Sequence, residues 1–501
     1  MSWRDEVSAA LAGGARFAGA WASGDVWRAA FVDGDGVRVL SCPAARAESI
    51  VDLVPAAGWD EREAHDLHGL AFPGRPLVDH TAPGWATPVT GDGVHEVAVG
   101  PIHAGVIESG HFRFHTVGDR VLVLDVRLFY KHRGLEAAAR GRDVADGLAY
   151  AQRACAACAV ANSVAYAQAV EDALGLAPDR DLRVARTLAL ELERLYNHLH
   201  DIGALCAGVG FAAGTMAFAA LKERAQRLNA RLCGHRFLFG TVRVGAGGLA
   251  VDEPAAARAE VRALRAEAAA GWRDLEFATS VQARLDGVGV LAPDDAVRLG
   301  ATGPAARASG VRSDARSHAP RLWYGDFVPA RPREETGDVA ARLQVRAAEL
   351  EATCELLDEL LAAPVAAGRT RDDGSRGGAG ARDAVLGRGA PSTRDSALGR
   401  GAPSAPDGAL GRGAPSRDSS LGRGAGARDS GLAIGVGRVE SPRGATLCAV
   451  EVAGGTVARL RLRTASYANW PAVAHAAAGC LLPDFPLINK SFELCYACVD
   501  R

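Results

Sequence analysis

The sequence predicts an α+β fold that is predominantly helical, with small flanking β-structure and a separate α+β domain at its N-terminal end. Length is the first observation, because 501 residues are enough for two or three domains and for a deeply buried site. The second is the early concentration of strand-like segments rich in β-branched and aromatic residues. The third is the helical spacing of Ala, Leu, Arg and Glu in later segments, which run from Leu135 to about Leu232, from Pro254 to Ala278 and from Asp338 to Leu361.

Residues 1–90 form the predicted N-terminal α+β domain. They contain an alternating segment around Val26 to Leu40 and a polar stretch, Trp59 to Leu70, that ends in Pro-rich sequence. Residues 91–367 are predicted to be the first part of the main body. This part opens with the strand-like segments FRFHTV and RVLVLDVRLFY, between Glu96 and Tyr130, and continues in helices.

A low-complexity insert occupies residues 368–430. The motif LGRGA recurs in it, and Gly, Arg, Asp, Ser and Pro surround each copy. Such sequence has almost nothing to bury, and each unit is shorter than the repeats that stack into a core, so we expect a disordered loop. The alternative is an Arg/Gly segment that touches RNA or an acidic partner, which the interspersed Asp residues disfavour. Residues 431–501 are predicted to be the C-terminal part of the body, with strand-like LCAVEVAGGTVARLRLRT and a helix after Asn469.

Charge and terminal composition set the expected location and exclude some partners. A formal charge of −2 and a pI near 6.7 give no basic field that could hold nucleic acid, so no nucleic-acid partner is expected. The first residues carry no cationic stretch followed by an apolar core and a cleavage site, so we expect a cytoplasmic protein. The uncharged run between Asp201 and Lys222 reaches membrane-spanning length, but its four glycines favour a buried core segment over insertion.

The ten cysteines divide into isolated residues and two Cys-x-x-Cys pairs. A disulfide framework is not expected in a reducing compartment, in a chain whose core needs no staples. The pairs are Cys155 with Cys158 and Cys495 with Cys498. Small buried side chains are the expected role of the others, which are Cys42, Cys206, Cys233, Cys354, Cys448 and Cys480.

The spacing within each pair suits metal binding. Residues i and i+3 lie on one face of a helix, so Cys155 and Cys158 can point at one ion, and Cys495 and Cys498 can do the same from a terminal turn. Four thiolates suit a soft metal, and structural zinc or separate redox thiols are the ordinary interpretation. Zinc motifs usually keep their pairs close together, whereas 336 residues (495 − 158 − 1) separate these. A central cofactor shared by the two ends of a large domain therefore stands beside zinc as a hypothesis.

The sequence around the first pair resembles that of [NiFe]-hydrogenase large subunits. The run RGLE at 133–136, followed by GRD at 141–143 and RACAAC at 153–158, is similar in order and spacing to the pattern in which R-G-x-E precedes R-x-C-G-x-C. Around the second pair, SYANWPAVAHAAAGCLLPDFPLINKSFELCYACVDR looks like the membrane-bound, formate-hydrogenlyase-type branch of this family, which is related to complex I. In that branch a Cys-x-x-Cys closes the mature large subunit.

Other segments extend the resemblance over nearly the whole chain outside the insert. GWDEREAHDLHGLAFPGRP at 58–76 is similar to the thirty-kilodalton subunit of complex I, which hydrogenlyase-type enzymes fuse to the large subunit. The resemblance implies a helical core like that of the hydrogenase large subunit or of the forty-nine-kilodalton subunit of complex I. Similarity to the latter covers GPIH at 100–103, GHFRF at 110–114, ELERLYNHLHDIG at 191–203, ATGPAARASGV at 301–311 and GRVESPRG at 437–444.

The resemblance implies a cofactor for the paired cysteines. Cys155, Cys158, Cys495 and Cys498 would all bind nickel, and Cys158 and Cys498 would also bridge to an iron that carries cyanide and carbon monoxide ligands. Electrons would pass to an iron-sulfur cluster, and because the chain has no CxxCxxC run, that cluster would belong to a small partner subunit.

The resemblance also implies roles for other residues. Glu108, in IESGHFR, would be the first proton relay, and the plainer hypothesis is a solvated loop carboxylate. Arg443, in the SPRG turn, would polarise bound H2, although a surface arginine after a proline fits the same letters. Glu136 would hold a structural magnesium ion, or would only interact with a helix dipole. Glu193 and His198 match the pattern of the forty-nine-kilodalton subunit, and we expect them to pack and hydrogen-bond within the core.

Several positions depart from the family's pattern. Ala156 stands where Gly is usual, Gln152 replaces Glu, Asn162 replaces His, and Leu494 replaces the Pro of D-P-C, which alters the turn that aims a thiolate. Arg501 stands about where hydrogenlyase-type precursors are cut after nickel insertion, so we expect either a form without the removable tail or a different maturation. The terminal His of many relatives is absent, which disfavours magnesium.

Three functions are consistent with these observations. The first is an oxidoreductase large subunit that interconverts H2 with protons and electrons. It would lie on the cytoplasmic face of a membrane, held by membrane partner subunits and by an iron-sulfur subunit like the twenty-kilodalton subunit of complex I. The second is an NADH:quinone oxidoreductase subunit of the forty-nine-kilodalton type that lacks hydrogenase activity. The third is a zinc-stabilised scaffold of a membrane redox complex.

Overall fold

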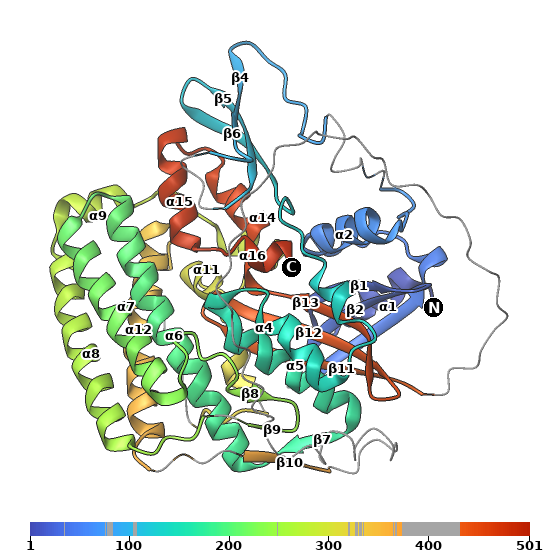
Figure 1. Cartoon of the computed structure of the whole chain (residues 1–501). Helices are drawn as coiled ribbons and strands as arrows, with labels where there is room; N and C mark the ends of the chain where they lie inside the picture. The colour runs from blue at the N-terminus through green and yellow to red at the C-terminus, as the bar shows by residue number, and fades with distance from the viewer. Residues whose placement is uncertain are drawn as a thin grey trace, which may run out of the picture.

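The computed structural model describes residues 1–501 except 35, 76, 78–83, 104–107, 248, 319–320, 326–328, 330–332, 334, 364, 366–367 and 373–430. An N-terminal domain and a layer of long helices lie on opposite sides of a central part that contains the C-terminus (Figure 1). Helices predominate in the described part, and its β-structure forms four small sheets. The predicted α+β, mainly helical fold is therefore confirmed.

The N-terminal domain is a three-stranded antiparallel sheet with two helices. The sheet has the order β1 (Arg16–Ser23), β2 (Val26–Asp33), β3 (Gly36–Pro43), so the segment predicted around Val26 to Leu40 forms its second hairpin. Helix α1 (Trp3–Ala12) begins at a capping box formed by Ser2 and Asp5. The polar stretch that follows forms α2 (Gly58–His68).

A second antiparallel sheet projects from the body at the top of Figure 1. It consists of β4 (Val94–Val99), β5 (His111–Val117) and β6 (Arg120–Arg127), and the last two are the strands predicted from FRFHTV and RVLVLDVRLFY. Phe112 and Phe114 alternate with polar residues on β5 and are buried, because their rings pack on Phe485.

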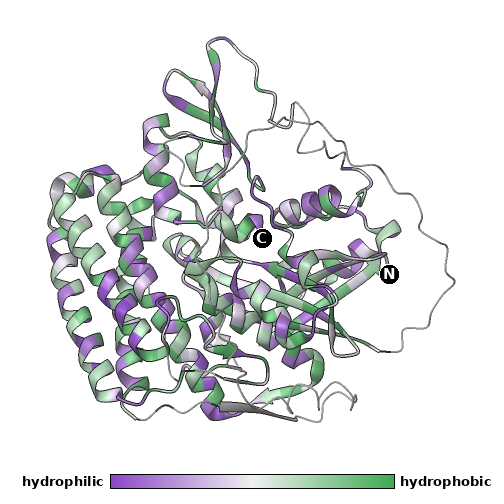
Figure 2. Cartoon of the chain, in the orientation of Figure 1, coloured by the Kyte–Doolittle hydropathy of each residue, from purple (hydrophilic) through white to green (hydrophobic). Residues whose placement is uncertain are grey.

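Four long helices form the helical layer, as the periodicity predicts. They are α6 (Arg180–Gly208), α7 (Ala212–Cys233), α8 (Pro254–Glu276) and α12 (Val339–Leu360). Helix α6 starts where Asp179 accepts a hydrogen bond from the backbone of Leu182 at 2.8 Å. Polar and apolar residues alternate around α7 and α8 in Figure 2, as expected for helices with one buried face.

The uncharged run after Asp201 divides between the end of α6 and the start of α7. None of the helices in the described ranges combines the length and the apolar character that crossing a bilayer requires. The expectation of a core segment is right for the end of α6, where Ile202, Leu205 and Cys206 are buried. It is only partly right for the start of α7, where Phe218 is buried but Met216 is 74% exposed.

The central part contains the elements that carry the cysteine pairs. The first pair lies between α4 (Val144–Gln152) and α5 (Ala159–Leu174), and α3 (Leu135–Ala139) precedes them. A third antiparallel sheet, β11 (Leu432–Ser441), β12 (Gly444–Ala453) and β13 (Thr456–Arg463), packs against α5.

Three helices follow that sheet and lead to the second pair. Helix α14 (Ala465–Ala477) starts earlier than the predicted position after Asn469, because Thr464 caps it by accepting from the backbone of Tyr467. Helices α15 (Phe485–Phe492) and α16 (Ala497–Asp500) come next. The remaining helices and strands are short: β7 (Leu176–Pro178), β8 (Val242–Arg243), β9 (Ala246–Gly247), α9 (Thr279–Leu285), α10 (Pro293–Arg298), α11 (Gly303–Ala308) and β10 (Gly368–Asp372).

The predicted insert is only partly within the described residues. Its first five residues form β10, which pairs with β7 and β9, so this edge of the predicted loop is a strand. The expectation of disorder for residues 373–430, and with it the LGRGA repeats, lies outside the described residues.

Two glycines bring β11 against the backbone of α5. A Cβ atom on Gly435 would lie 2.0 Å from the carbonyl oxygen of Ala169, and one on Gly437 would lie 2.0 Å from that of Ala165. Only a residue without a side chain permits this approach. Since α5 directly follows Cys158, the glycine contacts fix the helix that begins beside the first cysteine pair.

Replacing Gly437 by alanine is therefore expected to lower the free energy of unfolding by about 1–3 kcal/mol, because the new methyl group pushes α5 off the sheet. Chemical denaturation of the full chain measures the effect. Gly36→Ala is the matched control, since a Cβ there meets nothing nearer than the Asp33 carbonyl oxygen at 3.7 Å. Equal stability of the two variants would contradict the close packing.

Candidate metal centre

The first cysteine pair lies in a tight turn at the start of α5. Cys155 has extended backbone angles, η3 (Ala156–Cys158) follows it, and Cys158 is the residue that precedes the first turn of α5. The prediction that a helix face presents this pair is thus wrong in detail, because only the second cysteine adjoins a helix. Tyr196 and Asn197 of α6 donate hydrogen bonds to backbone carbonyls of the turn, at Ala156 and Ala157.

The second cysteine pair lies between α15 and α16. Glu493 ends α15 in the left-handed conformation, with φ of 50°, and turns the chain toward Cys495. The backbone N–H of Cys495 donates to Ser466 at 3.0 Å, and the Thr464 hydroxyl donates to the Cys498 carbonyl at 3.4 Å. The first turn of α14 therefore holds the pair.

The two pairs meet in the interior. The sulfur atoms of Cys155 and Cys495 are 3.1 Å apart, and those of Cys155, Cys158 and Cys498 all lie within 4.8 Å of one another. Four thiolates around one ion at about 2.3 Å would lie roughly 3.8 Å from each other. The sulfurs of Cys155, Cys158 and Cys498 are close enough to share an ion, and Cys495 adjoins this group through Cys155. Hydrogen bonds from Cys158, Cys495 and Cys498 hold the pKa of Cys155 well below its usual range.

Arg133 connects the backbone turns that carry the two cysteine pairs. Its guanidinium donates to the carbonyl oxygens of Arg153 at 3.0 Å, Ala154 at 2.7 Å and Ala497 at 2.9 Å. The last two of these carbonyls directly precede Cys155 and Cys498. Sequence reasoning placed Arg133 in the RGLE motif without giving it a role, and the structure shows it as the side chain that joins the two backbone turns.

Glu193 holds the start of α5 through its backbone. Its carboxylate accepts from the backbone N–H groups of Val160 at 2.7 Å and Ala161 at 3.1 Å, in place of a side-chain cap at the first turn of the helix. Burial raises the pKa of Glu193 to about 8. Glu193 therefore hydrogen-bonds within the core, as we expected. His198 does so as well, since its ring lies 2.9 Å from Glu349.

Replacing Glu193 by glutamine is expected to flatten the dependence of stability on pH. The folded chain binds the Glu193 proton more tightly than the unfolded chain, so its contribution is complete below pH 4.5 and is lost as the pH rises toward about 8. Thermal unfolding across this pH range should show a smaller loss for Glu193→Gln than for the wild type. The control is Glu267→Gln at an exposed carboxylate, and an unchanged slope in Glu193→Gln would contradict the assignment.

Arg443 is buried at the turn between β11 and β12, so it is not a surface arginine. It donates to the Glu493 carbonyl at 3.0 Å and to Asp201 at 3.1 Å, and its third contact is with the Asn197 side chain. Asp201, Cys158 and Cys155 raise its pKa, although burial acts in the opposite direction. The structure thus places a permanent positive charge beside the sulfurs.

Glu108 is half-buried and lies close to the second pair, beside the backbone of Ala497. Its pKa is raised by burial and by the nearby Cys155 and Asp500, while Lys131 and a hydrogen bond from the backbone of Ala497 act against this rise. Residues 104–107, which precede it, lie outside the described residues. A carboxyl group with a raised pKa near a thiolate cluster is suited to accept and release protons.

Glu136 does not lie with the cysteines. It is buried in α3, and its partners are the backbone N–H of Leu462 at 2.9 Å and the guanidinium groups of Arg459 at 3.3 Å and Arg501 at 3.2 Å. The isolated cysteines also lie outside the cluster of paired cysteines. Burial raises the pKa of two of them, Cys42 and Cys206, to about 11.

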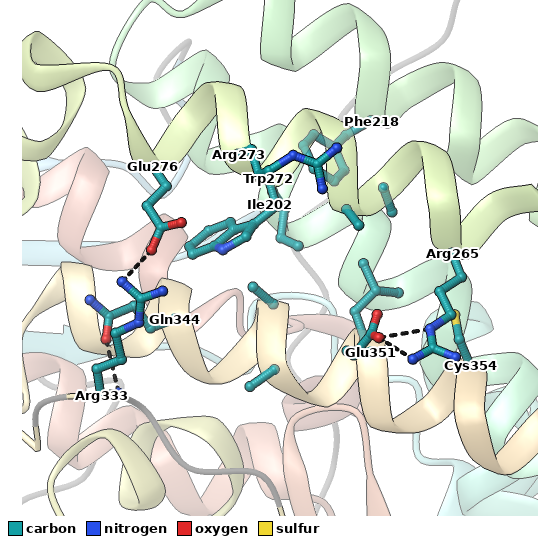
Figure 3. Close-up of a pocket in the computed structure, with 15 residues that line it drawn as sticks. Ile202, Phe218, Arg265, Trp272, Arg273, Glu276, Arg333, Gln344, Glu351 and Cys354 are labelled. Atoms are coloured by element: carbon teal, nitrogen blue, oxygen red, sulfur yellow. Dashed lines mark hydrogen bonds and ion pairs between the residues drawn. The ribbon is translucent and has the colours of Figure 1, made fainter.

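The described residues also form cavities remote from the sulfurs. Figure 3 shows one of about 360 Å³ between α8 and α12, with Trp272 and Phe218 along its wall and the ion pairs Arg265–Glu351 and Arg333–Glu276 at its rim. None of the described residues that line this cavity is one of the predicted site residues.

Three known families match successive parts of the chain. Residues 33–87 match the family described as respiratory-chain NADH dehydrogenase, 30 Kd subunit. Residues 133–232 match nickel-dependent hydrogenase. Residues 208–375 and 433–501 match respiratory-chain NADH dehydrogenase, 49 Kd subunit.

Curated relatives agree with these matches. Formate hydrogenlyase subunit 5 of Escherichia coli is 28% identical, over 90% of this chain and 76% of that protein. One subunit of the F(420)H(2) dehydrogenase of Methanosarcina mazei is 30% identical, over 53% of this chain and 71% of that subunit. The chain belongs to the [NiFe]-hydrogenase and complex I large-subunit family. The predicted resemblance is confirmed, including the fusion of a segment like the smaller complex I subunit to a body like the larger one.

A solved structure has the same fold as this large subunit. A chain of the membrane-bound sulfane sulfur reductase, an archaeal respiratory membrane complex, aligns with a TM-score of 0.64 at 22% identity, over 83% of this chain and all of that one. Membrane-bound hydrogenase subunit alpha of Pyrococcus furiosus is another relative, 27% identical over 53% of this chain and 64% of that protein. The hydrogenase and dehydrogenase relatives show that this large subunit is of the oxidoreductase type.

Proposed function

We propose that this large subunit interconverts H2 with protons and electrons at a nickel-iron centre held by Cys155, Cys158, Cys495 and Cys498. The observation that supports it is the meeting of these sulfurs in a buried cluster, with 3.1 Å between the sulfurs of Cys155 and Cys495. Thiolates are the donors that such a centre requires. Cys155, Cys158, Cys495 and Cys498 would hold this centre, and the centre would supply the redox chemistry and the polarisation of H2.

The surrounding side chains perform the remaining tasks. Arg443, fixed by Asp201 and the Glu493 carbonyl, keeps a positive charge against the cluster and favours the polarised form of H2. Glu108 accepts the proton that leaves the cluster and passes it outward. Burial of Cys155, Cys158 and Cys498 limits the access of water, which strengthens both electrostatic interactions.

We also propose partner subunits and a membrane location for this large subunit. Electrons pass to an iron-sulfur cluster of a small subunit like the twenty-kilodalton subunit of complex I, and membrane subunits hold the assembly on the cytoplasmic face. The names of relatives such as membrane-bound hydrogenase subunit alpha of Pyrococcus furiosus support a membrane-associated assembly.

Metal analysis of the purified assembly, combined with infrared spectroscopy, tests the proposal. Nickel and iron together, with bands from cyanide and carbon monoxide and with H2 oxidation by a dye, are the expected result. An assembly that contains zinc and neither nickel nor iron would contradict the proposal and support the scaffold function instead.

A quinone oxidoreductase subunit of the forty-nine-kilodalton type, without H2 chemistry, is the second candidate. Two observations favour it: the 49 Kd family match covers more residues than the hydrogenase match, and Ala156 and Leu494 depart from the hydrogenase motifs. A purified assembly that contains no metal at the four cysteines would select this candidate.

A further inference from the structure

Glu136 lies in a buried cluster of arginines where three parts of the chain meet. Oε1 accepts from the backbone of Leu462 at 2.9 Å and faces Arg501 at 3.2 Å and Arg461 at 3.8 Å. Oε2 accepts from Arg459 at 3.3 Å. Both carboxylate oxygens are therefore already turned toward hydrogen-bond donors.

This donor set does not fit magnesium. Mg²⁺ requires close to octahedral oxygen coordination at about 2.0–2.1 Å and usually keeps several water ligands. Around Glu136 the space for such ligands holds N–H groups and guanidinium groups, whose charge has the same sign as the ion. Another acid of the cluster, Glu63, faces Arg461 and lies 2.6 Å from Arg501, so it is also engaged by cations.

Arg501 contacts several parts of the chain through its side chain and its backbone. Its guanidinium donates to the Leu462 carbonyl at 2.7 Å and to Glu63 at 2.6 Å, and it lies 4.9 Å from the ring centroid of Tyr467. Its backbone carbonyl accepts from the backbone N–H groups of Arg133 at 3.1 Å and Leu135 at 3.3 Å. One buried residue thus touches α2, the start of α3, β13 and α14.

Arg501 is close in the sequence to the second cysteine pair, so its contacts also hold that pair. Arg501 follows α16, three positions after Cys498, and its backbone N–H donates to the Ala497 carbonyl at 3.2 Å. Glu63 belongs to the N-terminal domain. The ion pair between Glu63 and Arg501 therefore attaches the turn that carries the second cysteine pair to that domain.

We propose that the guanidinium groups of Arg501 and Arg461 take the place of a structural magnesium ion at Glu136 and bind the second cysteine pair to the N-terminal domain. This inference goes beyond the proposed function, because it holds whichever metal the cysteines bind.

The wild-type assembly provides the first test. After dialysis against magnesium-free buffer, we expect no stoichiometric magnesium by mass spectrometry, and we expect the same Tm with excess MgCl2, with excess EDTA or with neither. One magnesium per chain, or a Tm that EDTA lowers and MgCl2 restores, would overturn the replacement of the ion.

Variants provide the second test. Arg501→Ala is expected to lower the Tm by about 5–10 °C, because Glu63 and Glu136 keep their buried charge with one cation fewer. MgCl2 should then raise the Tm of the variant, although it leaves the wild type unchanged. Arg120→Ala, at an exposed arginine that donates to the Gly479 carbonyl, is the matched control.

If Arg501→Ala does not fold, Arg501→Lys gives the same readout with a milder change, since the ammonium keeps one charge but cannot reach all the acceptors. The measured variant is Arg501→Ala if it folds and Arg501→Lys otherwise. If its Tm equals that of the wild type, Arg501 is not the link to the N-terminal domain.

Discussion

Replacing Cys498 by serine is expected to abolish nickel retention and to reduce H2 turnover by roughly a thousand-fold or more, because the metal supplies the reaction centre. Serine is nearly the same size, but its hydroxyl is a harder and far less acidic ligand than a thiol. Cys498 is buried and lies within 4.8 Å of Cys155 and Cys158, so no water can substitute for the lost sulfur without opening the site. Metal content and dye-linked H2 oxidation measure the outcome.

Cys480→Ser is the matched control for that substitution. Cys480 is half-buried, and its thiol donates to the Ala476 carbonyl at 3.5 Å, a hydrogen bond that a serine hydroxyl can also make. We expect this variant to keep its metal and its activity. Full nickel and iron in Cys498→Ser would show that the cluster does not bind them through this residue.

Replacing Arg443 by lysine is expected to lower H2 turnover by about a hundred- to a thousand-fold, the usual cost of losing one preorganised charged donor. The planar guanidinium reaches the Glu493 carbonyl, Asp201 and Asn197 at once, and a single ammonium group cannot. Nickel and iron content and the infrared bands should stay the same.

Arg120→Lys controls for the change of arginine to lysine at an exposed site. A parallel loss of metal and activity in Arg443→Lys would assign Arg443 a structural role, because the arginine would then hold the second cysteine turn through Glu493 rather than act on H2.

The sequence predicted those parts of the structure that depend on local pattern. Alternation predicted β5 and β6, helical spacing predicted α6, α8 and α12, and the paired cysteines stood out by their spacing. The wide separation of the pairs raised a shared site as one hypothesis, and the family resemblance, not any periodicity, favoured it over zinc. The geometry agrees with it.

The sequence did not reveal contacts between charged residues far apart in the chain. Glu63 and Arg501 are 438 positions apart, and Arg461 and Asp60 are 401 apart, so no periodicity relates them. Nothing in the polar stretch of α2 indicated that Asp60, Glu61 and Glu63 are buried against arginines. The role of Arg133 was missed for a similar reason, since its partners are backbone carbonyls, one of them 364 positions away.

The separation of the cysteine pairs sets an order of events in the cell. Cys155 and Cys495 are 340 positions apart, so a ribosome adding about 5–20 residues per second makes the second pair roughly 20–70 seconds after the first. During that interval the nascent chain exposes only half of a ligand set. A centre that needs all four sulfurs, as proposed above, can therefore be completed only after Cys498 has been synthesised, and a chain whose synthesis stops before Cys495 would offer only half of the ligands.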